Sequence, residues 1–249
     1  MISKRSIDRP IVVIPARMAS TRLPGKPLAD IGGVPMIVHV WRRACEADIG
    51  AVVVACAEQE IADAVTGAGG RAVLTRPDHP SGSDRVCEAL DKIGAASELV
   101  VNLQGDLPTI DPGDIRKLAA TLESAPPSAD IATLVTEIRC DDEANDPNVA
   151  KAVVAFPPGT DIARALYFSR LPVPAGDAAR YHHIGIYAYR RKSLERFVAL
   201  PPSALEKSER LEQLRALEAG MTILARRVDS VPLGVDTPAQ LAEARRILC

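Results

Sequence analysis

A loop near the start of the chain gathers groups that can bind phosphate. Residues 15–26 hold three cationic side chains together with hydroxyls and a glycine: Arg17, Arg22, Lys26, Ser20, Thr21 and Gly25. Fixed cations offset the charge of a triphosphate, while hydroxyls and backbone N–H groups can approach its oxygens. The loop is not a Walker A sequence, because Pro27 stands where Ser or Thr would follow Gly-Lys. A solvated loop could also carry such cations, so its position in the fold has to decide.

Two aspartates far apart in the sequence are candidates for a second chemical role. Asp106 follows Gln104 and Gly105, and Asp236 precedes the last helical pattern of the chain. Alone, each would be an ordinary turn or cap residue, and Asp236 could cap the helix that starts near Pro238. If the fold brings them together, their oxygens form a hard site of the type that Mg²⁺ prefers.

The first half of the chain alternates short buried strands with helices. Apolar, β-branched runs predict strands at 11–14, 51–55, 72–74 and 99–103, and helical patterns occupy 36–47, 58–68 and 81–93. This order indicates an α/β fold with a mainly parallel central sheet. The loops at 16–26 and 104–106 each follow a strand, and ligands bind beyond the carboxyl ends of such strands. The position therefore favours a binding function for both loops.

The pattern loosens from about residue 124. Shorter strands are predicted at 131–137, 150–155 and 184–189, between proline-rich segments. We expect a single domain over 1–249, with about 124–202 as a smaller β-rich excursion. A helix at 203–219, a strand at 221–225 and a helix at 238–247 with Thr237 near its N-cap complete the prediction.

Composition excludes several classes of protein. The formal charge of −2 arises from 30 basic and 32 acidic residues that are scattered along the chain, so no basic face for a nucleic acid is expected. The first apolar run is interrupted by Pro15 and Arg17, which argues against a signal or membrane-spanning segment. Five cysteines without a C-x-x-C pair argue against a disulfide framework or a zinc site and fit a reducing compartment.

Residues 14–28 closely resemble the signature loop of 3-deoxy-manno-octulosonate (Kdo) cytidylyltransferases, or CMP-Kdo synthetases, and more distantly that of CMP-sialate synthetases. Further matches follow in order at 81–85, 102–106, 148–151, 165–170, 183–187, 211–215 and 234–238. The resemblance implies a Rossmann-like nucleotidyltransferase fold and a cytoplasmic, Mg²⁺-dependent enzyme. Such an enzyme joins CMP from CTP to the anomeric 2-hydroxyl of Kdo for lipopolysaccharide biosynthesis and releases pyrophosphate.

The resemblance also implies roles for individual residues. Asp106 and Asp236 would hold the metal and, with Lys26 and Arg17, form the catalytic set. The nucleotide-binding residues would be Ala16, Arg17, Arg22, Lys26, Ser81, Arg85 and Gln104. Ser81 and Asp84 also have the spacing of a capping box, and Ser81 can serve both purposes.

The sugar would be bound by Arg170, His183, Tyr187, Glu212 and Gln213. Without the resemblance, each has an ordinary explanation as a surface cation, a packed ring or a solvated helix charge. His39 and His79 have no sequence partner that suggests chemistry. The family usually forms homodimers through the β-rich excursion, so we expect a homodimer that binds CTP and Kdo and neither nucleic acid nor membrane.

Some features depart from the family pattern. Cys56 and Ala57 stand where many relatives have Thr-Asp, and Leu107 follows Asp106 where an acidic residue is common. The connection from Arg170 to His183 is also short, so a modified octulosonate, such as an 8-amino form, is an alternative substrate. A CMP-sugar synthetase that acts on a nonulosonic (sialic-type) acid is a separate alternative. A non-catalytic nucleotide sensor on the same fold is a further alternative, because a fold alone does not carry an activity.

Overall fold

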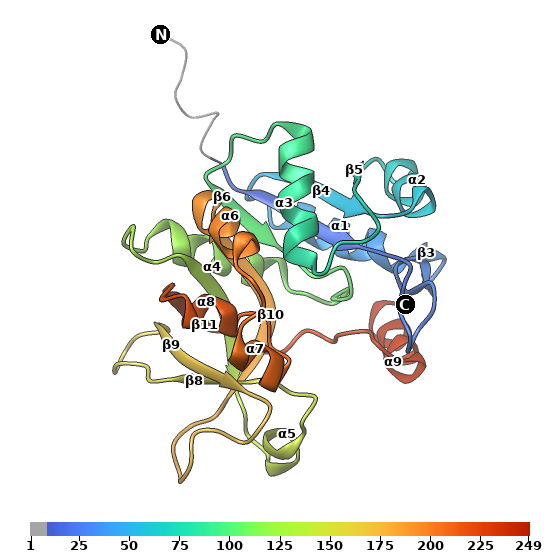
Figure 1. The fold of residues 1–249 in the computed structure, drawn as a ribbon. Coiled ribbons are helices and arrows are strands. Elements are labelled where there is room, and N and C mark those ends of the chain that lie inside the picture. The colour runs from blue at the N-terminus through green and yellow to red at the C-terminus, as the bar shows by residue number, and fades with distance from the viewer. Residues whose placement is uncertain (1–8) are drawn as a thin grey trace. The chain divides into compact units, whose positions relative to one another are not determined.

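The computed structural model describes residues 9–249, which divide into two compact units (Figure 1). The first unit comprises the chain up to Arg116 together with Pro232–Cys249, and the second comprises Lys117–Val231. Helix α4 (Pro112–Glu123), which the sequence analysis did not predict, contains the boundary between them. Residues 124–202 all belong to the second unit.

The first unit is built on a parallel sheet. Strand β1 (Ile11–Ala16) pairs in parallel with β4 (Ala51–Cys56) and β6 (Leu99–Asn102), and β4 pairs in parallel with β5 (Arg71–Leu74). The strand order is β5-β4-β1-β6, and the helices α1 (Met36–Glu46), α2 (Gln59–Gly67) and α3 (Gly82–Ile93) connect successive strands or precede them. The predicted parallel α/β arrangement is confirmed here. Its cause is visible in β1, where Val12, Val13 and Ile14 are completely buried.

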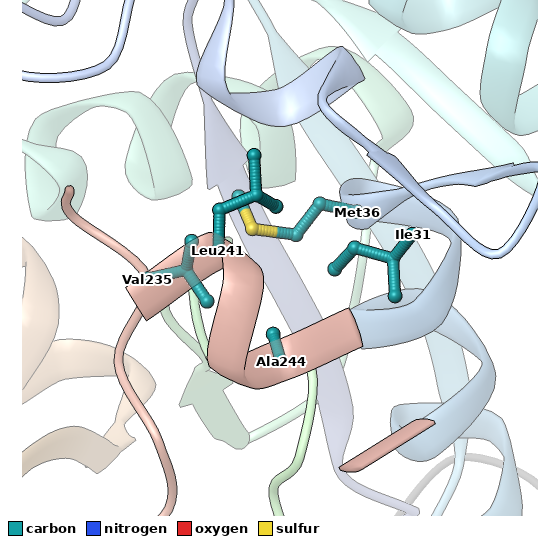
Figure 2. Close-up of a cluster of buried hydrophobic side chains, with 5 residues drawn as sticks. All are labelled: Ile31, Met36, Val235, Leu241 and Ala244. Atoms are coloured by element: carbon teal, nitrogen blue, oxygen red, sulfur yellow. The ribbon is translucent and has the colours of Figure 1, made fainter. Parts of the chain in front are cut away.

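The end of the chain returns to the first unit through an apolar cluster (Figure 2). Residues 15–26 are called the basic loop below. It is followed by a short 3₁₀ helix, η2 (Lys26–Leu28), and by the hairpin strands β2 (Asp30–Ile31) and β3 (Val34–Pro35). Helix α9 (Pro238–Leu248) packs against this region. The cluster consists of Ile31, Met36, Val235, Leu241 and Ala244, all of them buried. Burial of these side chains ties the segment before α9, including residue 236, to the start of the chain.

The second unit is rich in antiparallel strands. Its sheet has the order β10-β7-β11-β9-β8, and β8 pairs with β10 as well, so the pairing runs in a closed circuit. The strands are β7 (Ile131–Glu137), β8 (Lys151–Val154), β9 (Ile162–Ser169), β10 (Tyr181–Arg190) and β11 (Ile223–Arg227). Only the β7–β11 pair is parallel among the pairings described in this unit. Strand β9 was not predicted.

The helices of the second unit differ from the prediction. Besides α5 (Asp141–Asn145) and α6 (Arg191–Ala199), the unit contains α7 (Ala204–Glu209) and α8 (Leu214–Glu218). The single helix predicted at 203–219 is therefore wrong. The chain breaks at Arg210, which has the left-handed φ of 56°.

An ion pair explains why the helix is interrupted. The Arg215 guanidinium donates to both carboxylate oxygens of Glu206, at 2.8 Å from Nε and 2.6 Å from Nη2. Nine residues of continuous helix would rise about 13 Å, which is too far for this contact. The break thus lets α8 fold back on α7, and it leaves Glu212 and Gln213 in the connection between them.

Within residues 9–249, no helix combines the length and the apolar character needed to cross a membrane.

Candidate functional site

A cavity of the first unit lies at the carboxyl ends of its strands. It has a volume of about 700 Å³ and is bordered by the loops that follow β1, β5 and β6 and by residue 236. Every residue predicted to bind nucleotide or metal lines it: Ala16, Arg17, Arg22, Lys26, Ser81, Arg85, Gln104, Asp106 and Asp236. The structure therefore brings this whole predicted set together in one cavity of a size typical for small-molecule sites.

The local backbone explains how the basic loop is shaped. Gly25 adopts a left-handed φ of 67° directly before η2, a conformation that suits glycine, and Lys26 then begins that helix. Across the cavity, Gly105 lies against β1, where an added Cβ would come 2.9 Å from the carbonyl oxygen of Pro15. Glycine at 105 thus allows the loop that carries Asp106 to approach the loop that carries Lys26.

A backbone hydrogen bond brings the second aspartate to the first. The amide of Val235 donates to the carbonyl of Asp106 at 2.9 Å, and the amide of Leu233 donates to Thr109 Oγ1 at 2.8 Å. Thr237 caps α9 by accepting from the amide of Gln240, as predicted. Asp236 is therefore not needed as the cap, and its carboxylate is left for the cavity.

Lys26 joins the two aspartates. Its Nζ lies 2.6 Å from Asp106 Oδ2 and 3.0 Å from Asp236 Oδ1. Arg22 adds a contact of 3.0 Å to the other oxygen of Asp236. Burial by itself would lower the pKa of the Lys26 ammonium, but the two carboxylates outweigh it and raise that pKa above its ordinary value. Lys26 is thus charged at neutral pH and holds both carboxylates at one point.

The donor set at this point suits a hard divalent cation. Asp106 and Asp236 contribute carboxylate oxygens that already converge on one positive charge. Mg²⁺ commonly takes one or two protein carboxylates and completes its octahedron with water and phosphate oxygens. Among the described residues no group of three or more His, Cys, Asp or Glu side chains could hold a metal ion. A metal here would therefore depend on oxygens supplied by its ligand.

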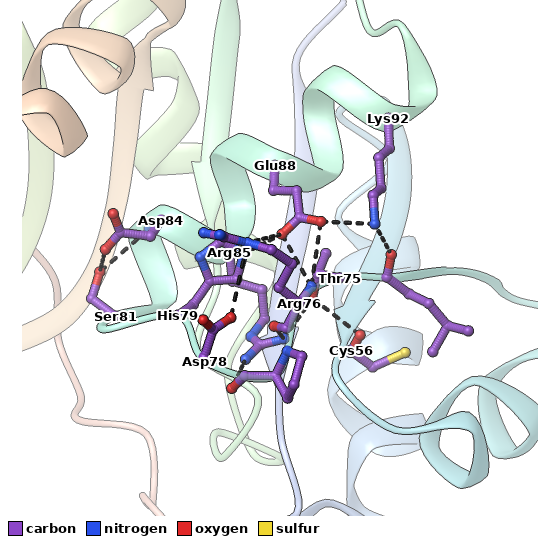
Figure 3. Close-up of polar contacts among 12 residues, drawn as sticks. Cys56, Thr75, Arg76, Asp78, His79, Ser81, Asp84, Arg85, Glu88 and Lys92 are labelled. Atoms are coloured by element: carbon purple, nitrogen blue, oxygen red, sulfur yellow. Dashed lines mark hydrogen bonds and ion pairs between the residues drawn. The ribbon is translucent and has the colours of Figure 1, made fainter.

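Ser81 and Arg85 line the cavity while they also stabilise the fold (Figure 3). Ser81 is the N-cap of α3 and accepts from the amide of Asp84, so the predicted capping role is confirmed. Arg85 is almost fully buried and donates to the carbonyls of Arg76 and Pro77, at 3.0 and 3.4 Å. Burial lowers the pKa of its guanidinium. Arg85 thus fixes the loop between β5 and α3 that forms one wall of the cavity.

Sequence reasoning missed His79, which lies in that same loop and lines the cavity. Its ring is 6% exposed and its Nε2 hydrogen-bonds to the carboxylate of Glu88 (Figure 3). The available signal was helical spacing: Ser81, Arg85 and Glu88 recur at intervals of four and three and so share one face of α3. His79 is held against that face of α3, where its partner Glu88 is nine positions away in the sequence.

In the second unit, three of the residues predicted to bind sugar lie together. His183 Nδ1 is 3.3 Å from Gln213 Nε2, and the rings of His183 and Tyr187 have centroids 5.6 Å apart. All three side chains are buried. Burial, with Tyr189 and Glu212 nearby, raises the pKa of the Tyr187 hydroxyl well above its ordinary value. The hydroxyl is therefore protonated at neutral pH.

Arg170 and Glu212 are placed differently. The Arg170 guanidinium donates to the carbonyl of Asn148 at 2.8 Å, and its own carbonyl accepts from the ammonium of the fully buried Lys151 at 3.0 Å. Glu212 Oε1 lies 3.9 Å from Arg215 Nη2. The Arg170 guanidinium is thus held by the backbone of another segment, although its charge does act on His183.

The hydrogen bonds around His183 define its tautomer. Gln213 Nε2 donates to Nδ1, so the ring proton is on Nε2 and is donated to Thr133 Oγ1 at 3.0 Å. The Thr133 hydroxyl donates in turn to the carbonyl of Ile186 at 2.8 Å. Burial, with the nearby charges of His182 and Arg170, lowers the pKa of His183 to about 3. Both ring nitrogens are engaged by protein groups, so His183 can bond to a sugar only by exchanging a partner.

Known proteins resemble this chain over nearly its whole length. Residues 11–223 match the cytidylyltransferase family profile. The 3-deoxy-manno-octulosonate cytidylyltransferase of Paramagnetospirillum magneticum is 62% identical over 241 residues, which is 96% of this chain and 97% of that protein. The enzyme of the same name from a Bradyrhizobium species is 63% identical over 240 residues and 96% of both chains.

The chain belongs to the 3-deoxy-manno-octulosonate cytidylyltransferase family. A solved structure described as CMP:2-keto-3-deoxy-manno-octonic acid synthetase complexed with CTP agrees with this family assignment. It is 42% identical and superimposes with a TM-score of 0.89 over 97% of this chain and 98% of that one.

Solved structures with lower sequence identity resemble this cytidylyltransferase in fold only. A putative glucose-1-phosphate thymidylyltransferase from Bacillus anthracis, in complex with a sucrose, has a TM-score of 0.66 at 18% identity, over 96% of this chain and 94% of that one. The nucleotidyltransferase fold that the sequence predicts is therefore confirmed, together with the recognition of the family.

Proposed function

We propose that this protein transfers CMP from CTP to the anomeric 2-hydroxyl of 3-deoxy-manno-octulosonate and releases pyrophosphate. The relatives that carry this activity in their names are more than 60% identical over nearly the whole chain. The solved structure that it resembles at 42% identity is described as a complex with CTP. The predicted role of the product in lipopolysaccharide biosynthesis rests on the resemblance to the family.

One observation carries the proposal: Lys26 bridges Asp106 and Asp236, which are 130 positions apart in the chain, within a cavity lined by Arg17 and Arg22. A triphosphate brings about four negative charges and needs cations along its length. The acidic pair needs a further cation if it is to stand beside the phosphates. Both needs are met by a cationic loop on one side of the cavity and a hard metal ion on the other.

The reaction forms a bond between the 2-oxygen of the sugar and the α-phosphorus of CTP and breaks the bond from that phosphorus to the bridging oxygen of pyrophosphate. The 2-hydroxyl loses its proton, and negative charge builds on the leaving group. Arg17, Arg22 and Lys26 would bind the β- and γ-phosphates and stabilise this charge. The protein thus acts by position and charge rather than through a covalent intermediate.

We further propose that the enzyme depends on Mg²⁺ held by Asp106 and Asp236. When bound, the ion would supply Lewis acidity that lowers the pKa of the sugar hydroxyl and aligns it with the α-phosphate. Lys26, which contacts both carboxylates, would keep them in place for the ion. The convergence of the two carboxylates on one ammonium supports this assignment.

For the sugar we propose Arg170, His183, Tyr187, Glu212 and Gln213. Of these, His183, Tyr187 and Gln213 lie close together. A carboxylate and several hydroxyls need a fixed cation and polar groups that both donate and accept. The protein would work in the cytoplasm as a homodimer, assembled through the β-rich part at about 124–202. Equilibrium sedimentation tests the dimer independently of activity.

A pyrophosphate-release assay tests the proposal as a whole. The protein is incubated with each of the four nucleoside triphosphates and with Kdo, its 8-amino form or a nonulosonic acid, with Mg²⁺ or with a chelator. We expect release only with CTP, an octulosonate and Mg²⁺, and with Kdo as the best acceptor. Binding of CTP without turnover on any acceptor would favour the nucleotide sensor. Turnover that persists in the chelator would exclude the metal.

A further inference from the structure

His79 is a buried histidine with one ring nitrogen left over (Figure 3). It lines the cavity of the first unit and is 6% exposed. Its Nε2 is bonded to Glu88, whereas its Nδ1 is buried and has no hydrogen-bond partner. A buried polar atom without a hydrogen-bond partner destabilises the protein, so a site of this kind calls for a ligand that completes it.

Glu88 fixes which nitrogen of His79 carries the proton. Its carboxylate accepts from Lys92 Nζ at 2.7 Å and from the amide of Arg76 at 3.1 Å, as well as from His79. Burial opposes the charged form, but these hydrogen bonds outweigh it and lower the pKa of Glu88 to about 2. An ionised carboxylate can only accept. His79 must therefore donate from Nε2, and in the neutral ring Nδ1 is left as a pure acceptor.

A lone pair at Nδ1 selects the part of a nucleotide that it can bind. Phosphate oxygens and carbonyl oxygens are acceptors at neutral pH and would face the lone pair unfavourably. An N–H or O–H donor would bind it well. Cytosine offers such a donor in its exocyclic 4-amino group, whereas uracil has a carbonyl oxygen at the same position.

The position of His79 in the sheet points to the nucleoside rather than the phosphates. The strand order is β5-β4-β1-β6, His79 follows β5, and Asp106 follows β6. Paired strands are about 4.8 Å apart, so the loop after β5 begins roughly 10 Å from the basic loop after β1. The acidic pair lies on the other side of that basic loop. A triphosphate held by the basic loop thus leaves the end near His79 for the nucleoside.

We propose that His79 is a specificity-determining residue whose Nδ1 accepts a hydrogen bond from the 4-amino group of cytosine, with Glu88 as the positioning residue that fixes the ring. This inference rests on the proposed function in one respect, since it takes CTP as the nucleotide. It adds a reason why that nucleotide would be chosen over UTP.

Nucleotide binding without turnover tests the role of His79. Calorimetry in Mg²⁺ compares CTP with UTP and with the triphosphate of the 2-pyrimidinone riboside, which lacks any group at position 4. We expect the unaltered protein to bind CTP about tenfold or more tightly than the pyrimidinone analogue, as for one buried hydrogen bond. His79→Phe should lose this preference by weakening CTP alone. An unchanged ratio of the two affinities in His79→Phe would overturn the inference.

A matched control is His39→Phe, because His39 hydrogen-bonds to the carbonyl of Ile31 and does not line the cavity. Its ratio of affinities should equal that of the unaltered protein. If the unaltered protein binds CTP well but the ratio survives in His79→Phe, only this inference fails. If it binds no nucleoside triphosphate, the proposed function fails with it.

The ¹⁵N resonances of the His79 ring supply a second measurement, which can be made on the unaltered protein and so does not depend on whether a variant folds. In the unaltered protein we expect a protonated Nε2 and an unprotonated Nδ1, and the Nδ1 resonance should move on addition of CTP but not of the analogue. In Glu88→Gln the carboxamide can donate as well as accept, so the second tautomer should appear and the preference for CTP should fall in part. An Nδ1 resonance indifferent to CTP would overturn the inference.

Discussion

The cavity of the first unit and the cluster around His183 in the second unit treat polar groups differently. In the cavity the charged side chains stay partly open: Lys26 is 17% exposed, Asp106 27% and Asp236 38%. Around His183 the side chains are closed in, with Thr133 completely buried and Gln213 5% exposed. The first region keeps surface for a ligand, while the second is already saturated by protein partners.

The pKa values express the same contrast. Two carboxylates raise the pKa of Lys26, so its charge is kept. Burial lowers the pKa of His183 to about 3, so its charge is suppressed. A region that retains charge can bind phosphate and metal ions, whereas a region of neutral, fixed hydrogen bonds can only orient donors and acceptors. The cavity of the first unit thus suits a phosphate-bearing substrate, whereas the cluster around His183 can bind a sugar only where a protein partner is exchanged.

The largest effect is expected for Asp106→Asn. The amide keeps the shape of the carboxylate but removes half of the acidic pair, so the turnover number for pyrophosphate release should fall by about 10²- to 10³-fold. Circular dichroism and thermal unfolding should show a folded protein. Asp48→Asn is the control, because Asp48 forms an exposed ion pair with Arg9. Full turnover in Asp106→Asn would mean that the charged groups of the cavity are not needed for the reaction, and the contrast between the two regions would then have no functional meaning.

A smaller loss is expected for Lys26→Met, which removes the bridge but leaves both carboxylates. Turnover should fall by about 10- to 10²-fold, since part of the phosphate charge is no longer offset. Because the folded pKa of Lys26 is raised, its contribution to stability is complete below its unfolded value of 10.5 and is lost as the pH rises through the folded pKa. Urea unfolding should therefore separate the two proteins at pH 8, and the difference should shrink only as the pH rises beyond 10.5.

The sequence was sufficient for the framework of the first unit. Buried β-branched runs such as the one in β1 can hardly form anything but interior strands, and loops that follow parallel strands meet at one edge. This reasoning placed Lys26 and Asp106 at one edge of the sheet, and the resemblance to the family added Asp236; all three line one cavity. The hydrogen bond from Val235 to Asp106, which joins the two aspartate-bearing segments, is a backbone contact, and a pattern of side chains cannot predict it.

The second unit was predicted less well, for a physical reason. Hydrophobic periodicity reports on local burial, and the leucines of 203–219 satisfy a helical pattern even though the chain turns at Arg210. The ion pair of Glu206 with Arg215 decides that turn, and it is a tertiary contact. The hydrogen-bond partners of His79 and His183 were not predicted for the same reason, because each partner lies on a different element from its histidine.

Thr133→Val tests the saturated region at the level of stability. Valine has the same shape but leaves the His183 Nε2–H and the Ile186 carbonyl without their partner, so the free energy of unfolding should fall by about 1–3 kcal/mol. The Michaelis constant for Kdo should rise several-fold, with turnover little changed. Thr136→Val, on the same strand, is the control, because the hydroxyl of Thr136 bonds to the carbonyl of Ser230 at the surface. Equal stability of both variants would mean that the buried hydrogen bonds of Thr133 to His183 and Ile186 do not stabilise the fold.

The smallest effect is expected for pH, and it is the sharpest test of the contrast. With a folded pKa of about 3 against an ordinary value of 6.5, His183 should stay neutral between pH 8 and 5, so its ring resonances should not move over that range. The folded pKa is lowered, so the contribution of this residue to stability is complete above pH 6.5 and is lost as the pH falls towards 3. In urea the same resonances should titrate near 6.5, which provides the reference. If the folded ring titrates near neutrality instead, the second region carries charge after all, and the division between a charged and a neutral region is wrong.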